Sequence, residues 1–267
     1  MARRNRLAPP AAARAPWFFA LVGALLGLAI AVAFFAPARW LAAAVQRASD
    51  GHVLLQAPRG TVWDGSAQLV LAGGADSRDA TALPGQLEWT IRPTLSGATA
   101  RLVNRCCMTD PLKLDAQLSL SGAQLRLADG ASQWPAGLLA GLGAPFNTLQ
   151  PEGQLELSTQ GFNATYAGGR WSIEGQVRLD ANDVSSRLST LRPMGSYRVT
   201  LQGGPAPTMK LETLSGSLQL TGSGQFVGTR LQFEGTASAA PDRIDALANL
   251  LNIIGRRDGA RAIIKVG

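Results

Sequence analysis

One stretch decides the fold class of this chain: Leu112-Lys-Leu-Asp-Ala-Gln-Leu-Ser-Leu120. Its five apolar residues occupy every second position and alternate with four polar or charged residues. Because successive side chains of a β-strand point to opposite faces, this alternation predicts a strand with one apolar and one wet face. Strands of this kind are typical of antiparallel sheets.

A repeated phrase extends the pattern along the chain. Glycine followed by polar, apolar, polar and apolar residues occurs at Gly85, Gly153, Gly175, Gly195 and Gly216. From Gly153 onward the copies begin 20 to 22 residues apart, which fits one strand, one turn and one returning strand. We therefore predict a mainly β domain over residues 53–267, built as an antiparallel meander of hairpins.

Three short helices are predicted beside these strands. Residues 41–48 precede the first strand, and residues 134–142 interrupt the strands near the middle of the chain. The third begins at Pro241, whose ring suits a first helical turn, and ends at Gly255. We expect this amphipathic C-terminal helix to cover one end of the sheet. Its apolar face consists of Ile244, Leu247, Leu250, Leu251 and Ile254.

The alternation leaves open whether the sheet closes into a sandwich or stays a curved trough. A closed sandwich is the default expectation, because large exposed apolar patches are rare without a partner. In a trough the same apolar stripe would be free to hold acyl chains, as in bridge-like lipid carriers of the cell envelope. The stripe consists of Leu114, Leu118, Leu155, Leu157, Val177, Val199, Leu218 and Phe233.

The N-terminus predicts a membrane anchor. Trp17 to Ala36 are twenty residues without charge, about 30 Å of helix, which matches the hydrocarbon core of a bilayer. We assign residues 1–15 to a basic cytoplasmic tail, 16–38 to a transmembrane helix and 39–52 to a membrane-proximal segment, by the positive-inside rule. The residues expected to face the membrane or its interfaces are Trp17, Phe18, Phe19, Leu21, Leu25, Leu28, Phe34, Phe35 and Trp40.

A cleaved signal peptide is the competing interpretation of this segment. Small residues stand at 31–33 and 36–38, where a peptidase would cut. The apolar run is longer than the usual signal core of about 7–15 residues, which favours retention. Either way, the rest of the chain is expected to be exported.

Charge argues against nucleic-acid binding. The formal net charge is +7, but six of the 25 basic residues lie at or before Arg47, which leaves 19 basic and 18 acidic residues after it. No basic block with interleaved aromatic residues occurs in that part. The excess positive charge therefore serves membrane orientation, and no nucleic-acid partner is expected.

The two cysteines are adjacent, Cys106 and Cys107. Neighbouring side chains of a strand point apart, so a disulfide between them requires a turn, which residues 108–111 supply. Two small apolar residues at a strand end are the equal alternative, and an intermolecular disulfide ranks third.

Catalytic and metal-binding patterns are absent from the sequence. His52 is the single histidine, and there is no Gly-x-Ser-x-Gly, His-Glu-x-x-His or Cys-x-x-Cys motif. We therefore expect a protein that is not an enzyme and holds no cofactor or metal.

A more pointed motif stands at 59–66, where strand-like residues precede the tight-turn signal Asp64-Gly65. A turn with a buried Trp63 is the plainer interpretation. The alternative is a partner-binding loop made of Arg59, Thr61, Trp63 and Asp64.

Three phrases together resemble the type II secretion system protein N family. They are Gly-Thr-Val-Trp-Asp-Gly at 60–65, Leu-Pro-Gly-Gln-Leu-Glu-Trp at 83–89 followed by Arg92-Pro93, and the segment 249–261. Their order after a single anchor extends the resemblance over nearly all of residues 53–267.

The resemblance implies an accessory protein of the bacterial inner membrane, with its N-terminus in the cytoplasm and its main domain in the periplasm. Its partners would be other secretion components, in the inner-membrane platform or the outer-membrane secretin, and it would support export of folded proteins across the outer membrane. It carries no catalytic residues over to this chain. A periplasmic trough that binds or conveys lipid is the alternative function.

Overall fold

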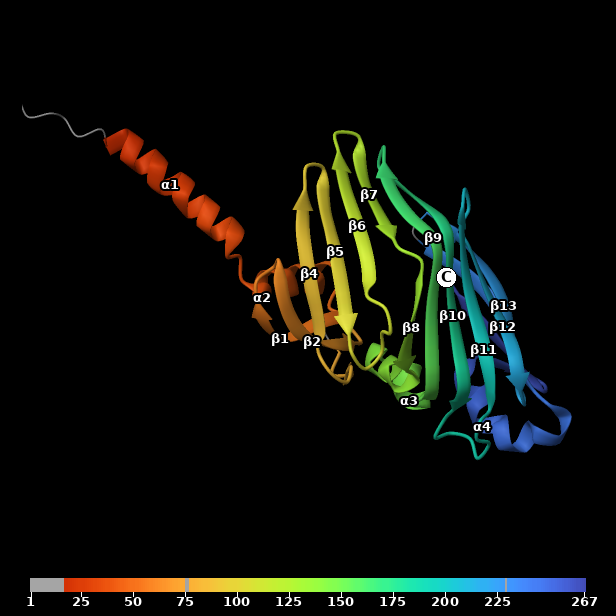
Figure 1. Cartoon of the computed structure of the whole chain (residues 1–267). Coiled ribbons are helices and arrows are strands. Elements are labelled where there is room, and N and C mark those ends of the chain that lie inside the picture. Colours follow the sequence, from red (N-terminus) through yellow and green to blue (C-terminus); the bar gives the residue numbers. More distant parts are fainter. Residues whose placement is uncertain (1–16, 75–76, 229) are drawn as a thin grey trace, which may run out of the picture. The chain divides into compact units, whose positions relative to one another are not determined.

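The structure is a computed structural model that describes residues 17–74, 77–228 and 230–267 (Figure 1). The chain divides into two compact units, one ending at Ala36 and one from Pro37 to Gly267. The basic tail predicted at 1–15 lies outside the described residues.

The first unit contains helix α1 (Trp17–Phe34), 18 residues without a charged side chain. Within the described part of the chain, no helix has both the length and the apolar character needed to cross a membrane. The membrane assignment of residues 16–38 stays a prediction.

In the second unit, sixteen strands of the described residues form one sheet whose pairings are antiparallel. They are β1(Val53–Gly60), β2(Asp64–Ala72), β3(Ala80–Ala82), β4(Leu87–Thr94), β5(Gly97–Asn104), β6(Leu112–Ser119), β7(Gly122–Leu127), β8(Gly130–Pro135), β9(Glu152–Ala167), β10(Arg170–Ser185), β11(Gly195–Gly204), β12(Thr208–Gly216), β13(Leu218–Val227), β14(Arg230–Ala239), β15(Arg256–Asp258) and β16(Arg261–Val266).

The strand order follows the chain almost throughout, which confirms the predicted meander. It runs β1-β2-β4-β5-β6-β7-β9-β10-β11-β12-β13-β14-β16-β15, with β3 paired to β2 and β8 paired to β9. The repeated glycine phrases begin or cross strands β9, β10, β11 and β13 and precede β4.

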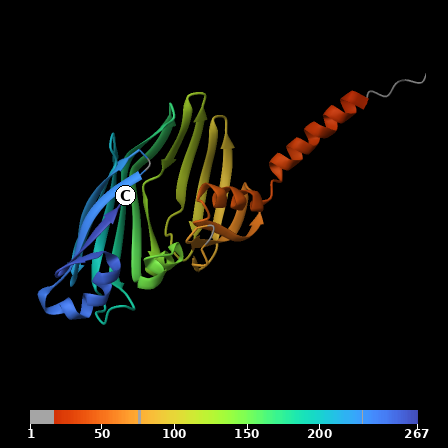
Figure 2. The ribbon, with the colours of Figure 1, turned by 180° about the vertical axis from the view of Figure 1, so that it is seen from behind.

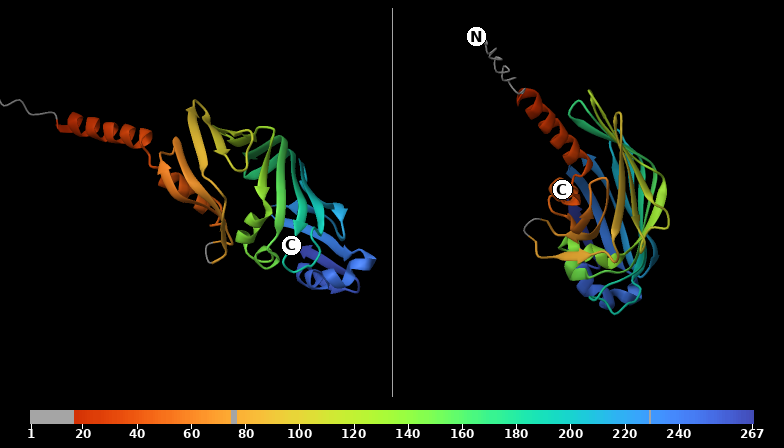
Figure 3. Two further views of the ribbon diagram at one scale, coloured as in Figure 1. Left: turned by 60° about the horizontal axis from the view of Figure 1, so that its bottom comes forward. Right: turned by 60° about the vertical axis from the view of Figure 1, so that its left-hand side comes forward.

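The expectation of a closed sandwich was wrong, because the sheet is a single open layer. Its two ends are different strands, β1 and β15, which do not pair with each other. Figure 3 shows this one layer bending strongly across its width. The bend, together with the helices that pack on one face of the sheet, replaces the second sheet that a sandwich would need.

Short helices cover parts of this face. Helix α2 (Ala38–Ala48) packs on β1 and β2, and η1 (Ala136–Leu142) with α3 (Phe146–Leu149) packs near β2, β3 and β9. Helix α4 (Ile244–Ile254), entered through η2 (Pro241–Arg243), packs on β14, β15 and β16. All three predicted helical stretches are therefore present, and the C-terminal helix covers one end of the sheet as expected.

Among the described residues, the buried core forms three clusters rather than one. The largest packs Leu247, Leu250 and Leu251 of α4 against Tyr197 and Leu218. A second, under α2, contains Ala38, Ala67 and Trp89. A third, under η1, contains Leu83, Cys107 and Leu138.

Candidate binding surfaces

The apolar stripe lies on one face of the sheet, the face that carries α2 and α4. Strand register pairs Leu114 with Leu127, and it pairs Leu179 with both Leu157 and Val199. Directly paired residues share a face, and residues two apart along a strand share it too. The eight stripe residues predicted from the alternation thus point the same way.

Their burial differs with position along the sheet. Leu155, Leu218 and Phe233 are buried, whereas the stripe residues between the helices are only half-buried: Leu114, Leu157, Val177 and Val199. Figure 2 shows α2 and α4 toward the two ends of this face, with η1 and α3 between them at the lower ends of the strands and no helix over the upper parts of those strands in that view. The middle of the face is therefore an open apolar surface.

Leu118 is an exception within the stripe. It lies beside the β6–β7 turn and is 68% exposed, so no core packs on it. A carboxylate placed at this position would be solvated. A charged substitution of Leu118 would therefore be tolerated in a packed core and in a trough alike.

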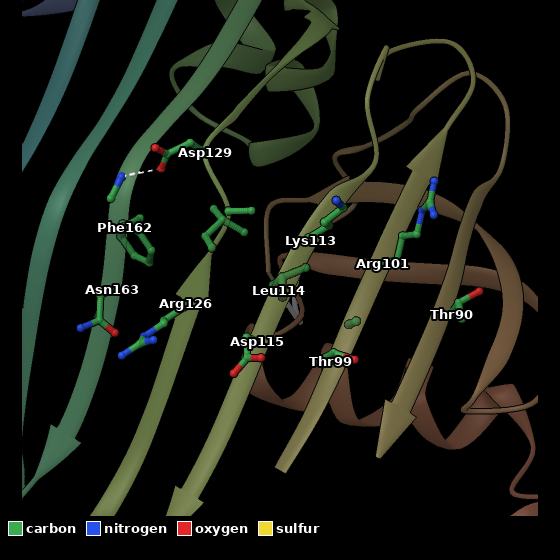
Figure 4. Close-up of a pocket in the computed structure, with 14 residues that line it drawn as sticks. Thr90, Thr99, Arg101, Lys113, Leu114, Asp115, Arg126, Asp129, Phe162 and Asn163 are labelled. Carbon is green, nitrogen blue, oxygen red and sulfur yellow. Dashed lines mark hydrogen bonds between the residues drawn. The ribbon is translucent and has the colours of Figure 1, made fainter. Parts of the chain in front are cut away.

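A hollow of about 590 Å³ opens where β7 separates from β9. The β7–β9 ladder ends at Arg126 and Asn163, and β8 resumes the pairing at Gly130 and Thr159. Across this gap, Asp129 Oδ1 accepts the N–H of Gly161 at 2.6 Å (Figure 4). The break in the ladder forms one side of this hollow, and residues of β4, β5 and β6 line the rest of it.

The lining of this hollow mixes apolar and charged side chains. Figure 4 labels Leu114 and Phe162 together with Arg101, Lys113, Asp115 and Arg126. The lining residues include neither histidine nor cysteine, so they offer no imidazole base and no thiol nucleophile. The lining therefore offers both apolar and charged contacts.

The segment predicted as a partner-binding loop is a turn between β1 and β2, and several hydrogen bonds hold its conformation. Thr61 Oγ1 accepts the backbone N–H groups of Trp63 and Asp64 at 3.2 and 3.0 Å. The indole Nε1 of Trp89 donates to the carbonyl oxygens of Thr61 and Val62 at 3.2 and 3.1 Å. The Thr-Val-Trp-Asp phrase thus has a structural role, in which the turn satisfies a buried indole.

Two further features hold this turn in place. Arg92 donates to Asp64 Oδ2 at 2.8 Å, and this hydrogen bond lowers the pKa of Asp64 below its ordinary value. A Cβ at Gly65 would meet the Trp89 ring, so glycine permits the close approach. Arg59 and Asp64 are exposed and Trp63 is half-buried, and the binding of a partner here stays a prediction.

The cysteines lie in the turn after β5, where Cys106 and Cys107 are joined in a disulfide. Cys107 packs against Leu83 and Leu138. The fully buried Asn104 accepts the N–H of Cys106 at 3.0 Å through Oδ1. Sequence reasoning missed Asn104, because a single asparagine at a strand end carries no signal of burial.

Sequence reasoning also missed a cross-strand ion pair on the outer face of the sheet, which is the face opposite the apolar stripe. Arg198 donates two hydrogen bonds of 2.7 Å to the two carboxylate oxygens of Asp180, its direct partner across β10 and β11. These bonds lower the pKa of Asp180 and raise that of Arg198. Elsewhere in the described residues, no three His, Cys, Asp or Glu side chains gather closely enough to bind a metal ion.

Comparison with known proteins gives one match. A protein-family model described as type II secretion system (T2SS), protein N, matches residues 51–264. No curated protein and no solved structure is significantly similar to the chain. The matched residues begin just before β1 and end within β16, so they span the whole sheet together with α4.

Proposed function

The chain belongs to the type II secretion system protein N family, and on this basis we propose that it is a non-enzymatic accessory component that supports export of folded proteins across the outer membrane. Family membership indicates a component of type II secretion in the cell envelope. The observation that carries the proposal is the extent of the match, which covers the open sheet from end to end.

The proposed arrangement in the envelope follows the distribution of charge and apolar residues. Residues 16–38 anchor the chain in the inner membrane, with the basic tail 1–15 in the cytoplasm and residues 53–267 in the periplasm. The uncharged surface of α1 supports this arrangement. The anchor holds the domain beside the inner-membrane components of the secretion machine.

Docking on those components uses the turn at 59–64. Its hydrogen bonds hold Thr61, Trp63 and Asp64 in a fixed conformation before a partner arrives, which lowers the entropic cost of binding. Arg59 is placed beside them by its pairing with Ser66 in the β1–β2 ladder. The two outermost strands are poor docking sites by comparison. Strand β1 carries a bulge between Gln56 and Arg59, and β15 is three charged residues long.

The decisive test is secretion in a strain that lacks the gene. Folded exoproteins should accumulate in the periplasm behind an intact outer membrane, and the wild-type gene should restore their release into the medium. Normal secretion in the deletion strain would contradict the proposal. Quantitative proteomics of medium and periplasm, with an outer-membrane permeability assay, provides the readout.

A crosslinking experiment tests the docking turn separately. A photoreactive amino acid at Arg59 should capture other secretion components in intact cells, whereas the same probe at the exposed Thr190, in the loop between β10 and β11, should not. Equal capture at both positions, or no capture at position 59, would contradict docking by this turn. It would not contradict the role in secretion.

The uncovered middle of the apolar face favours a second candidate function, the binding or conveying of lipid. Half-buried apolar side chains from β6, β9, β10 and β11 share this face and could contact an acyl chain. A deletion strain with a leaky outer membrane and normal secretion would favour this function over the first. Phospholipid that co-purifies with the full chain and is lost from Val199→Asp would support it further.

A further inference from the structure

The turns of the meander divide between the two long edges of the sheet. Because consecutive strands run antiparallel, the β4–β5, β6–β7, β9–β10, β11–β12 and β13–β14 turns share one edge, which also carries the β1–β2 turn. Figure 1 shows the first three of these at the top and α3 and α4 at the opposite edge. We call these five turns, without the β1–β2 turn, the hairpin rim: residues 93–98, 117–124, 165–172, 203–208 and 226–231, apart from residue 229.

The hairpin rim presents large apolar side chains directly to solvent. Leu95 and Leu120 are fully exposed, and Trp171 and Val227 are 60% and 53% exposed. These side chains stand at or beside tight turns, beyond the reach of any core cluster. An edge with repeated exposed apolar tips marks an interaction surface.

The first three tips of the rim are joined to one another. Leu118 donates its N–H to the carbonyl of Ser96 at 2.6 Å, which joins the first two tips. Gly122 pairs with Ala167, which joins the second tip to the third. At that third tip, the rings of Tyr166 and Trp171 lie 5.1 Å apart.

The charge of the rim separates it from the rest of the domain. Its sequence contains no acidic residue, and its two charged residues are Arg170 and Arg230. The opposite edge carries both signs, with Asp110 and Asp242 in its connections and Asp183 near the end of β10. The β1–β2 turn, next to the rim on its own edge, also carries both signs, at Arg59 and Asp64. Exposed leucines, an aromatic pair and arginines without carboxylates are the chemistry of a surface that enters an anionic lipid interface.

We propose that the hairpin rim contacts the surface of a phospholipid bilayer. Leu95, Leu120 and Trp171 enter the boundary between headgroups and acyl chains, and the two arginines bind phosphate groups. The absence of carboxylates removes the repulsion that an anionic membrane would otherwise impose. This contact depends on neither the secretion role nor lipid transport. It uses turns other than the proposed docking turn at 59–64, which lies on the same edge of the sheet.

Site-directed spin labelling of the full chain tests the contact. Leu120→Cys and the control Thr190→Cys are each labelled with a nitroxide and reconstituted into vesicles of phosphatidylcholine and phosphatidylglycerol. The native cysteines are bonded to each other and take up no label. Oxygen, which concentrates in bilayers, should relax the label at position 120 several-fold more than a water-soluble nickel complex does, and the label at 190 should show the reverse.

Two results would overturn the contact. One is a label at position 120 as accessible to nickel as the label at 190. The other is a label at 120 shielded from both reagents, because that would place a protein, such as a second copy of this chain, on the rim.

A charge variant tests the role of the arginines. Arg170→Gln with Arg230→Gln should lower the inserted fraction relative to the free fraction about 25-fold in the anionic vesicles, since each basic side chain contributes about fivefold there. It should have no effect in vesicles of phosphatidylcholine alone. The control Arg187→Gln, exposed in the β10–β11 loop, should leave insertion unchanged in both. Equal losses for the double variant and the control would contradict the phosphate contacts.

Discussion

One apolar face shows two degrees of burial in this molecule. Where α4 covers the sheet, its residues Leu250 and Leu251 are at most 1% exposed and pack on Tyr197 and Leu218. In the middle of the same face, Val199 and Val177 are half-buried. The strands have the same alternation in both places, so the covering helix, and not the strand pattern, decides where this sheet has a core.

The difference in energy follows from the difference in burial. Removing a Val, Leu or Phe side chain fully from water stabilises a fold by about 1.5–3 kcal/mol. The leucines of α4 contribute this in full, while the middle of the face contributes only part of it. The sheet is therefore held by the clusters beneath α2, η1 and α4 and by the backbone ladders between them.

The largest expected effect comes from placing a charge in each region. Leu250→Asp should prevent folding, because an unpaired carboxylate beneath α4 costs several kcal/mol. Val199→Asp should fold, because its carboxylate reaches water on the open face. Yield and circular dichroism of the purified full chain measure both. Loss of folding in both variants would show that the middle of the face is covered.

Truncation gives a graded form of the same comparison. Leu251→Ala should lower the free energy of unfolding by about 2–4 kcal/mol, as expected for a fully buried leucine. Val177→Ala should lower it by about 1 kcal/mol or less, since the half-buried site leaves no closed cavity. Urea titration of the two variants provides the comparison, and equal losses would contradict it.

The third prediction concerns the N-terminal core beneath α2. Trp89→Phe keeps an aromatic ring but removes the indole N–H that binds the carbonyls of Thr61 and Val62. We expect a loss of about 1–2 kcal/mol in unfolding free energy. Hydrogen exchange should increase in residues 60–64 more than in α4. A uniform increase over both regions would show that the turn does not depend on this indole.

The outer-face ion pair should matter less, and its effect should depend on pH. Asp180→Asn should cost about 1–2 kcal/mol at neutral pH, because two charge-assisted hydrogen bonds to Arg198 are weakened. The folded-state pKa of Asp180 is lowered, so this stability is present above the ordinary carboxyl pKa and disappears as pH falls through the folded-state value.

Urea titrations of wild type and Asp180→Asn at neutral and acidic pH measure this dependence. The two curves should converge in acid. Glu152→Gln, which breaks the exposed pair with Arg192, serves as the control and should change stability little at either pH. A difference for Asp180→Asn that persists unchanged into acid would contradict the assignment.

The smallest effect is expected at Tyr197. Its buried hydroxyl has no hydrogen-bond partner among the described residues, so Tyr197→Phe should be nearly neutral at pH 7. Burial raises the pKa of Tyr197, which means that the wild type loses stability as pH rises above the ordinary tyrosine pKa of about 10. Urea titration in alkali should show a shallower loss for Tyr197→Phe than for the wild type.

The sequence predicted much of the fold because the deciding signals are local. The alternation at 112–120 and the glycine phrases specify strands and hairpins, and the apolar spacing after Pro241 specifies α4. Closure of the sheet was not predictable in this way. The alternation of apolar and polar residues in a strand such as Val199–Leu201 is the same whether a second sheet or solvent faces it.

Features that depend on strand register, or on where a strand ends, could not be predicted from the sequence either. Asp180 and Arg198 become partners only through the pairing of β10 with β11. Leu118 belongs to the apolar stripe by periodicity, but its place beside a turn exposes it. The partner turn was predicted as a turn, whereas its link to the Trp89 indole required a tertiary contact 27 or 28 residues away.

Cysteine accessibility tests the open face most directly. Leu114→Cys, half-buried in the middle of the face, and Leu250→Cys, buried beneath α4, are each exposed to a small water-soluble maleimide in the folded full chain. The open sheet predicts that the thiol at 114 reacts readily and the thiol at 250 reacts only after denaturation. Equal protection of both thiols in the folded chain would contradict it.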